Sequence, residues 1–178
     1  MHKMLVLAAI GFAIGTAFAQ TAPYAGEQHR EIKSLSSSEV ADLLAGQGTG
    51  LAKAAELNGY PGPAHVLEHA DALALTADQK QGSKALMDRH KERARHIGAA
   101  LVASERALDQ TFATRTIEPG RLSQLTAEIG ELQAQLRAEH LRTHLAQTAL
   151  LSADQVKRYG TLRGYGGDAA PAAHQRRH

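Results

Sequence analysis

Two pairs of histidines have a spacing that suits metal binding. His65 and His69 are four residues apart in HVLEH, and His140 and His144 are four residues apart in HLRTH. Side chains at i and i+4 share one face of a helix, so each pair would present two imidazoles side by side. Imidazole is a common ligand of Zn²⁺, Cu²⁺, Ni²⁺ and Co²⁺. Both pairs are therefore candidate ligands of a divalent transition metal.

A fifth histidine joins these pairs only if the chain forms the right helices. His90 follows Leu86 by four residues and falls on the apolar stripe of a long predicted helix. In an antiparallel pair of long helices, His90 would be level with His140 and His144, and the helix of the first pair would join at the same end. We expect the five histidines to converge. The alternative is that they are ordinary polar residues flanking an apolar stripe.

The same short motif follows each histidine pair, as LTADQ after the first and LSADQ after the second. In each copy a hydroxyl residue precedes a glutamine by three positions, which is the capping-box arrangement at a helix start. There the hydroxyl and the carboxamide each accept a hydrogen bond from the other residue's backbone N–H group. The predicted helix-cap residues are Leu75, Thr76, Gln79, Leu151, Ser152 and Gln155.

These paired motifs resemble the LTxxQ motifs of the Spy/CpxP family of periplasmic stress chaperones, which includes related heavy-metal resistance and sensor proteins. The likeness covers residues 65–165 and departs from the family pattern at Ser152, which replaces threonine. It implies a hooked helical hairpin that dimerises into a cradle and binds unfolded clients without ATP. Residues 24–62 lie outside the shared motif, and the resemblance gives them no function.

The resemblance also bears on the histidines. Metal-sensor members of the family place a histidine pair just before the first motif, where His65 and His69 lie. They carry further ligands on the helix before the second motif, where His140 and His144 lie, although the spacing to that motif does not match securely. The resemblance therefore implies a metal site only as an alternative to chaperone activity.

The elements that must position these residues are predicted to be helices alone. Apolar residues from 77 to about 112 recur at helical spacings and form one stripe. After a turn at residues 116–120, leucine and isoleucine alternate at three and four residues along a second long helix, which ends near residue 149. We therefore expect an all-α fold, a long antiparallel helical hairpin with short flanking helices. The flanking helices are predicted near residues 36–45, 51–58, 64–75 and 153–162.

The chain divides into four predicted segments. A basic start, an apolar run and Ala17-Phe18-Ala19 indicate a signal peptide, residues 1–19, that is cleaved after Ala19. With the resemblance, this predicts a periplasmic location. Residues 20–63 form an N-terminal extension with short helices, residues 64–166 the LTxxQ-type hairpin domain, and residues 167–178 a disordered tail.

Each long helix carries only a thin apolar stripe, and a lone hairpin would bury little of its surface. A second copy or another partner would supply the missing burial. We therefore expect a homodimer.

Composition excludes several classes of protein. The chain has no cysteine, which rules out disulfides and thiolate metal sites. Without the signal peptide it carries 19 Lys and Arg against 18 Asp and Glu, a net charge of +1, and aromatic residues make up only 4% of the chain. We expect no nucleic-acid partner, because that would need a basic face with stacking aromatics. No catalytic motif is present, so we do not expect an enzyme.

Two functions follow as expectations. The leading one is an ATP-independent, chaperone-like envelope-stress protein that binds unfolded or partly folded envelope proteins and requires no cofactor. The alternative is a periplasmic sensor or resistance protein that binds Zn, Cu, Ni or Co through the clustered histidines. A third possibility is a helical interaction module for a membrane-bound signalling partner.

Overall fold

The computed structural model describes residues 22–165. The predicted signal peptide, residues 1–19, and the predicted disordered tail, residues 167–178, lie outside this range. The described part of the chain is mostly helical and contains no β-strand, which confirms the predicted all-α class. Its elements are η1 (Glu27–His29), α1 (Ser37–Ala45), α2 (Lys53–Glu56), α3 (Pro63–Glu68), α4 (Ala77–Ala113), α5 (Pro119–Ala149) and α6 (Ala153–Leu162).

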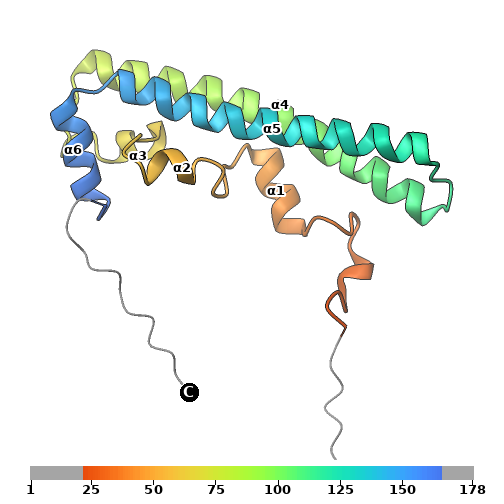
Figure 1. The fold of residues 1–178 in the computed structure, drawn as a ribbon. Coiled ribbons are helices and arrows are strands. Elements are labelled where there is room, and N and C mark those ends of the chain that lie inside the picture. Colours follow the sequence, from red (N-terminus) through yellow and green to blue (C-terminus); the bar gives the residue numbers. More distant parts are fainter. Residues whose placement is uncertain (1–21, 166–178) are drawn as a thin grey trace, which may run out of the picture.

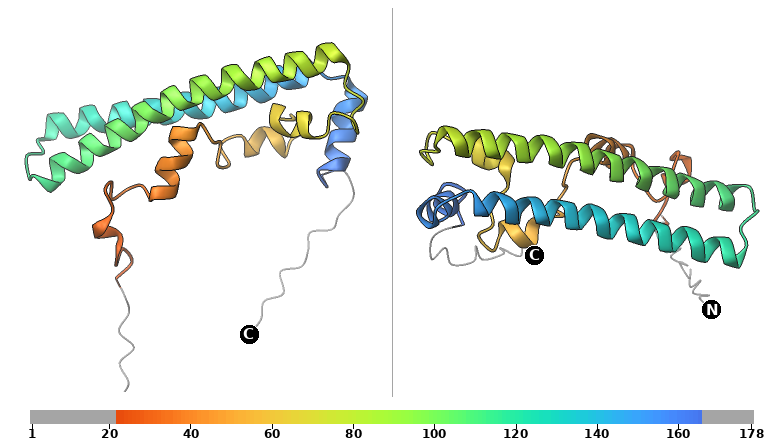
Figure 2. Two further views of the ribbon diagram at one scale, coloured as in Figure 1. Left: turned by 180° about the vertical axis from the view of Figure 1, so that it is seen from behind. Right: turned by 90° about the horizontal axis from the view of Figure 1, so that it is seen from above.

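The two long helices α4 and α5 pack together along their length, as Figures 1 and 2 show. Near the start of α4, Gln147 donates to the hydroxyl of Ser83 at 3.0 Å. Further along α4, Ser104 donates to Glu128 at 2.7 Å. Residues that come later in α4 therefore contact residues that come earlier in α5. Both helices end within two residues of their predicted bounds, because the apolar stripe and Pro119 mark them in the sequence.

One apolar cluster lies along the middle of this helix pair. Its buried residues are Ala94, Leu101, Ile129 and Leu136, which we call the seam face. Their seven-residue spacing within each helix places them on one side of that helix, which confirms the predicted stripes there. The predicted stripe is not buried at the C-terminal end of α4, where Phe112 is 54% exposed.

A second cluster lies at the other end of the pair, where α3 and α6 meet it. It consists of Val66, Leu73, Leu75 and Tyr159, and we call this region the motif end because both LTxxQ-like copies lie there. Figure 1 shows α6 across this end and α1, α2 and α3 along one side of α4 and α5.

The predicted helix at residues 64–75 is wrong in length, because α3 ends at Glu68. Residues 69–75 turn back instead, and Ala74 adopts a left-handed conformation with φ 49°. This turn buries Leu73 and Leu75, which are 1% and 7% exposed. A continued helix would not direct both leucines into the motif end, so tertiary packing overrides the helical pattern.

The N-terminal extension packs against the long helices instead of standing apart. We call residues 31–51 the strap. Leu43 and Leu51 of the strap pack on the seam face, and Ile32 is 1% exposed. The strap therefore supplies within one chain part of the burial that we expected from a second copy. Its polar contacts with α4 are Arg106 Nε to Glu31 at 2.9 Å, Ser34 Oγ to Glu105 at 2.8 Å and Lys33 N to Asp109 at 3.0 Å.

The strap approaches α4 most closely at Gly98. A Cβ atom at this position would lie 2.2 Å from the carbonyl oxygen of Leu43. Glycine inside a helix costs about 1 kcal/mol relative to alanine. The close backbone contact with α1 explains why α4 carries a glycine here. Among the described residues, no helix is long and apolar enough to cross a membrane.

Candidate functional site

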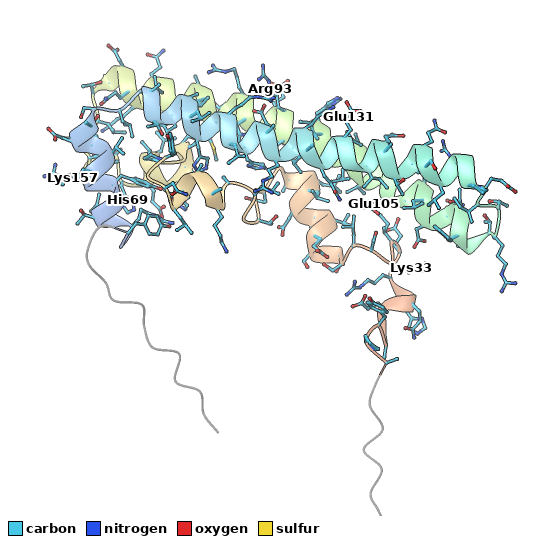
Figure 3. The ribbon with its side chains drawn as sticks, in the orientation of Figure 1. Lys33, His69, Arg93, Glu105, Glu131 and Lys157 are labelled. Carbon is cyan, nitrogen blue, oxygen red and sulfur yellow. The ribbon has the colours of Figure 1, made fainter. Side chains whose placement is uncertain are left out.

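Four of the five candidate histidines line one pocket of about 360 Å³. His90 comes from α4, His140 and His144 from α5, and His65 from α3. The predicted convergence of the two long helices therefore brings these side chains together. His69 does not line the pocket. It lies at the C-cap of α3, on the side of the molecule near α6, where Figure 3 labels it.

His90 and His140 form the buried floor of this histidine pocket. Their ring centroids are 4.4 Å apart and the rings are nearly perpendicular, an edge-to-face contact. His90 Nδ1 lies 3.1 Å from the hydroxyl of Thr143 and 3.5 Å from Glu139 Oε1. Thr143 also donates to the carbonyl of Glu139 at 2.9 Å. Because that hydroxyl proton points to Glu139, the Thr143 oxygen accepts from His90 Nδ1, which leaves His90 Nε2 as a lone-pair nitrogen in the neutral ring.

His140 is the least satisfied polar side chain of the pocket. It is 5% exposed, and its Nε2 is buried without a hydrogen-bond partner. Burial lowers its pKa to about 4, helped by the nearby His90 and His144. Burial also lowers the pKa of His90, although its contacts with Glu139 act in the opposite direction. Both rings are therefore neutral at pH 7, and a neutral imidazole is the form that binds metals.

Backbone contacts orient the third histidine. His144 Nδ1 lies 2.7 Å from the carbonyl oxygen of Tyr60, so this nitrogen carries the proton and donates it. The other ring nitrogen then has a free lone pair, which is how a backbone carbonyl prepares a metal-binding imidazole. Gly62 lies flat against the ring, since a Cβ there would be 2.8 Å from His144 Nε2. Gly48 lies in the same way against the ring of His140, with 3.1 Å between its would-be Cβ and His140 Nδ1.

Glu56 closes the pocket from α2. Its carboxylate lies 3.9 Å from His65 Nδ1 and 3.7 Å from His144 Nδ1. Its Oε1, the oxygen that faces His65, also accepts a 2.5 Å hydrogen bond from the hydroxyl of Tyr159. Arg163 Nε lies 3.4 Å away and neutralises the charge. Burial, the Glu56 hydrogen bond and the Glu56 charge together raise the pKa of Tyr159, so its hydroxyl stays a donor.

The pocket has the donor types of a transition-metal site without the finished geometry. Among residues 22–165, no three histidine, aspartate or glutamate side chains are arranged to hold a metal ion. The unpartnered Nε2 of His140 and the free lone pair of His144 are nevertheless suitable ligands for Zn²⁺ or Cu²⁺. A third ligand would have to come from a side-chain rotation of His90, His65 or Glu56.

The two LTxxQ-like copies contact each other at the motif end. Both form the predicted capping box, with Thr76 accepting from Gln79 N and Ser152 accepting from Gln155 N. The two glutamine side chains also bond to each other, at 2.8 Å from Gln79 Nε2 to Gln155 Oε1 and 3.0 Å in the other direction. The repeated motif is therefore a tertiary lock between the starts of α4 and α6 as well as a pair of helix caps.

Each glutamine also holds the chain just before the other copy. Gln79 Nε2 donates to the carbonyl of Leu150 at 2.8 Å, and Gln155 Nε2 donates to the carbonyl of Leu73 at 3.2 Å. Leu75 is buried and Leu151 packs against the same cluster. These contacts place both bends of the chain at a fixed distance from each other.

The seam face is a second candidate site, because the strap covers only part of it. A hollow of about 580 Å³ separates the strap from α5, and its lining includes Leu43, Leu101, Leu136 and Arg137. A second hollow, of about 460 Å³, runs along α4 beside Lys33 and exposes Phe112. Apolar surface thus stays open to solvent on both sides of the strap.

Sequence reasoning missed several residues of these sites. Glu56, the carbonyl of Tyr60 and the glycines at 48 and 62 all lie in the extension, to which we assigned no function. The glycine- and proline-rich segments GQGTG and NGYPGP were the available signal. Such segments allow close backbone approach, and here they approach imidazole rings.

Comparison with known proteins gave no match: no family model, no curated protein and no solved structure corresponds to this chain.

Proposed function

We propose that the protein is a chaperone-like envelope-stress protein that binds unfolded or partly folded polypeptides without ATP. The observation that carries this proposal is the half-covered seam face, where Leu101 and Leu136 line an open hollow beside the strap. Apolar surface left exposed in this way commonly marks an interaction site. The long charged side chains along α4 and α5 would allow weak and adaptable contacts around it.

The proposal includes the finer expectations from the sequence. We propose a protein of the LTxxQ type, resembling the Spy/CpxP family, that is exported to the periplasm after cleavage behind Ala19. The hooked hairpin, its homodimeric cradle and a membrane-bound signalling partner belong to the same proposal. The contact between Gln79 and Gln155 supports it, since the two motif copies serve a common structural role.

A light-scattering assay tests the chaperone proposal. A client that aggregates on reduction or heating is mixed with the mature protein in EDTA and without ATP. We expect suppression of scattering near equimolar ratios, and a loss of part of it in Phe112→Ser, because this side chain is 54% exposed beside the strap. Leu162→Ser is the matched control, since Leu162 is 42% exposed on α6. No suppression at a large excess of protein would contradict the proposal.

A second candidate function is divalent-metal sensing or buffering, favoured by the histidine pocket. The specific observation is the buried Nε2 of His140, which has no partner in the folded protein. His140 and His144, with His65 or His90, would hold the ion. A bound ion would link α5 to α3 through His65 or to α4 through His90.

Calorimetric titration with Zn²⁺, Cu²⁺, Ni²⁺ and Co²⁺ tests this second candidate. We expect a His65→Ala/His140→Ala variant to lose most of the affinity and His96→Ala, an exposed histidine of α4, to keep it. Binding should also weaken as the pH falls toward about 4, where the His140 ring takes up a proton, because protonated imidazole is not a ligand. Equal affinity in the double variant would rule out the pocket.

A further inference from the structure

The strap shows which chemistry the seam face accepts. It contributes a short helix, α1, with a complete capping box at Ser36 and Glu39. The anchors are aliphatic: Leu43 and Leu51 pack on the seam face. The segment is also acidic, with three carboxylates against one lysine. Arg106 pairs with Glu31, and Arg137 lines the same hollow as Glu39 and Asp42. The carboxylates of Glu105 and Asp109 on α4 instead contact Ser34 and Lys33 of the strap.

The fit is specific at one point. The carbonyl of Leu43 lies directly over Gly98, where any side chain would collide with it at 2.2 Å. The obstacle is backbone, so it cannot rotate aside. We call this close approach at Gly98 the notch. Because only a glycine leaves room for that carbonyl, the notch fixes the point at which a helical segment crosses α4 and can bind.

The strap is nevertheless held by few buried groups. No residue of α1 is fully buried, and Leu44 is 47% exposed. A glycine-rich joint follows, in which Gly46 and Gly50 have φ values of 71° and 92°. Segments with few buried contacts open locally at much lower free energy than the rest of a protein. The strap is therefore able to leave the seam face while α4 and α5 stay paired.

The space beside the strap would accommodate a larger segment. The hollow toward α5 includes Gly130 and Ala134, which the strap does not cover. The hollow along α4 continues to Leu108 and Phe112. Neither hollow is filled by the described part of the chain. A partner that reached into both would bury more apolar surface than the strap does.

We propose that the strap is an exchangeable occupant of the seam face, which it yields to other polypeptide segments of the same chemistry. These are short amphipathic helices with leucine or isoleucine anchors and acidic flanks. The strap then sets a threshold for binding, since a partner must compete with it. This inference rests on the proposed chaperone function and specifies where a client binds and what controls access.

A fluorescein-labelled synthetic peptide of residues 31–51 is the probe. Its fluorescence anisotropy is measured with the mature full-length protein. We expect Ile32→Asp/Leu43→Asp, which releases the strap, to bind the peptide about tenfold more tightly than the wild type, because the face is then free. Leu44→Asp is the matched control: it changes the neighbouring exposed residue and should bind as weakly as the wild type.

The notch gives a second variant. Adding Gly98→Ala to the released protein should abolish the gain, because the new Cβ meets the carbonyl of the peptide's own leucine. Alanine also favours the helix, so this change should not unfold α4. A released variant that keeps its helical circular dichroism and still binds no tighter than the wild type would overturn the proposal.

A cross-link tests the same idea without destabilising the strap. The chain has no cysteine, so Ser34→Cys/Glu105→Cys can be joined selectively by a short bis-maleimide. We expect the cross-linked protein to suppress client aggregation several-fold less than the same protein before cross-linking. Equal suppression by both forms would refute the strap as a competitor and leave the chaperone function standing. If the peptide binds as expected but no form suppresses aggregation, the exchangeable strap stands and the chaperone function fails.

Discussion

The motif end and the strap are both attached to the same pair of long helices, but they are attached in different ways. At the motif end, Tyr159 is 1% exposed and the paired glutamines satisfy each other and two backbone carbonyls. The strap instead rests on Ile32, a half-buried Leu43, a part-buried hydrogen bond from Ser34 to Glu105 and two exposed ion pairs. Surface ion pairs contribute little to stability, about 0–1 kcal/mol each. Buried contacts therefore hold the motif end, whereas few fully buried side chains hold the strap.

The largest effect should come from the core of the motif end. Tyr159→Ala removes a buried aromatic ring and leaves Glu56 without its hydroxyl donor. We expect a loss of about 3–5 kcal/mol in the free energy of unfolding, measured by chemical denaturation. The control Tyr165→Ala, at a residue that is 41% exposed, should change it by less than about 0.5 kcal/mol. Equal losses in the two variants would remove the distinction between the regions.

The next effect is a pH dependence that arises in the histidine pocket beside the motif end. The pKa of His140 is about 4 in the folded protein, and an unfolded histidine titrates near 6.5. The unfolded state therefore binds more protons between these values. The free energy of unfolding should fall as the pH drops from about 6.5 to about 4, by up to about 3 kcal/mol.

Denaturation curves across this pH range check the assignment. His140→Leu should flatten the dependence, whereas His96→Leu, at an exposed histidine, should leave it unchanged. Part of the pH dependence of the free energy of unfolding should remain in His140→Leu, because burial also lowers the pKa of His90. An unchanged slope in His140→Leu would mean that another group titrates.

A smaller loss should follow from breaking the lock between the motif copies. Gln155→Ala leaves the Leu73 carbonyl and the Ser152 backbone N–H without their side-chain partner and removes the contact with Gln79. Unsatisfied polar groups of this kind cost about 1–3 kcal/mol, and the partial exposure of this site favours the lower value. The midpoint of urea unfolding measures it. Gln81→Ala, on the exposed side of α4, is the control and should have almost no effect.

The smallest change in global stability should come from the strap. Leu43→Asp should lower the global free energy of unfolding by less than about 1 kcal/mol, because α1 opens separately from the rest. Native-state hydrogen exchange should show faster exchange of the α1 amides and unchanged protection around Ile129. A global loss as large as that of Tyr159→Ala would show that strap and helix pair unfold as one unit.

Local signals explain which parts of this molecule were predictable. Both capping boxes form as predicted, since they depend on residues only three apart. The bounds of α4, α5 and α6 follow from apolar periodicity and helix-breaking residues. His90 is buried, as its place on the stripe indicated. The length of α3 was not predictable, because it depends on Leu73 and Leu75 finding Tyr159 more than 80 residues away.

The sequence by itself determined the helical class, the starts of the helices and the presence of paired motifs and histidines, because these are properties of neighbouring residues. Only the tertiary structure decided what those features contact. It joined Gln79 to Gln155, separated His69 from the other four histidines and laid the extension over Gly98. These outcomes depend on packing between segments far apart in the chain, where one backbone contact or one buried leucine outweighs a local pattern.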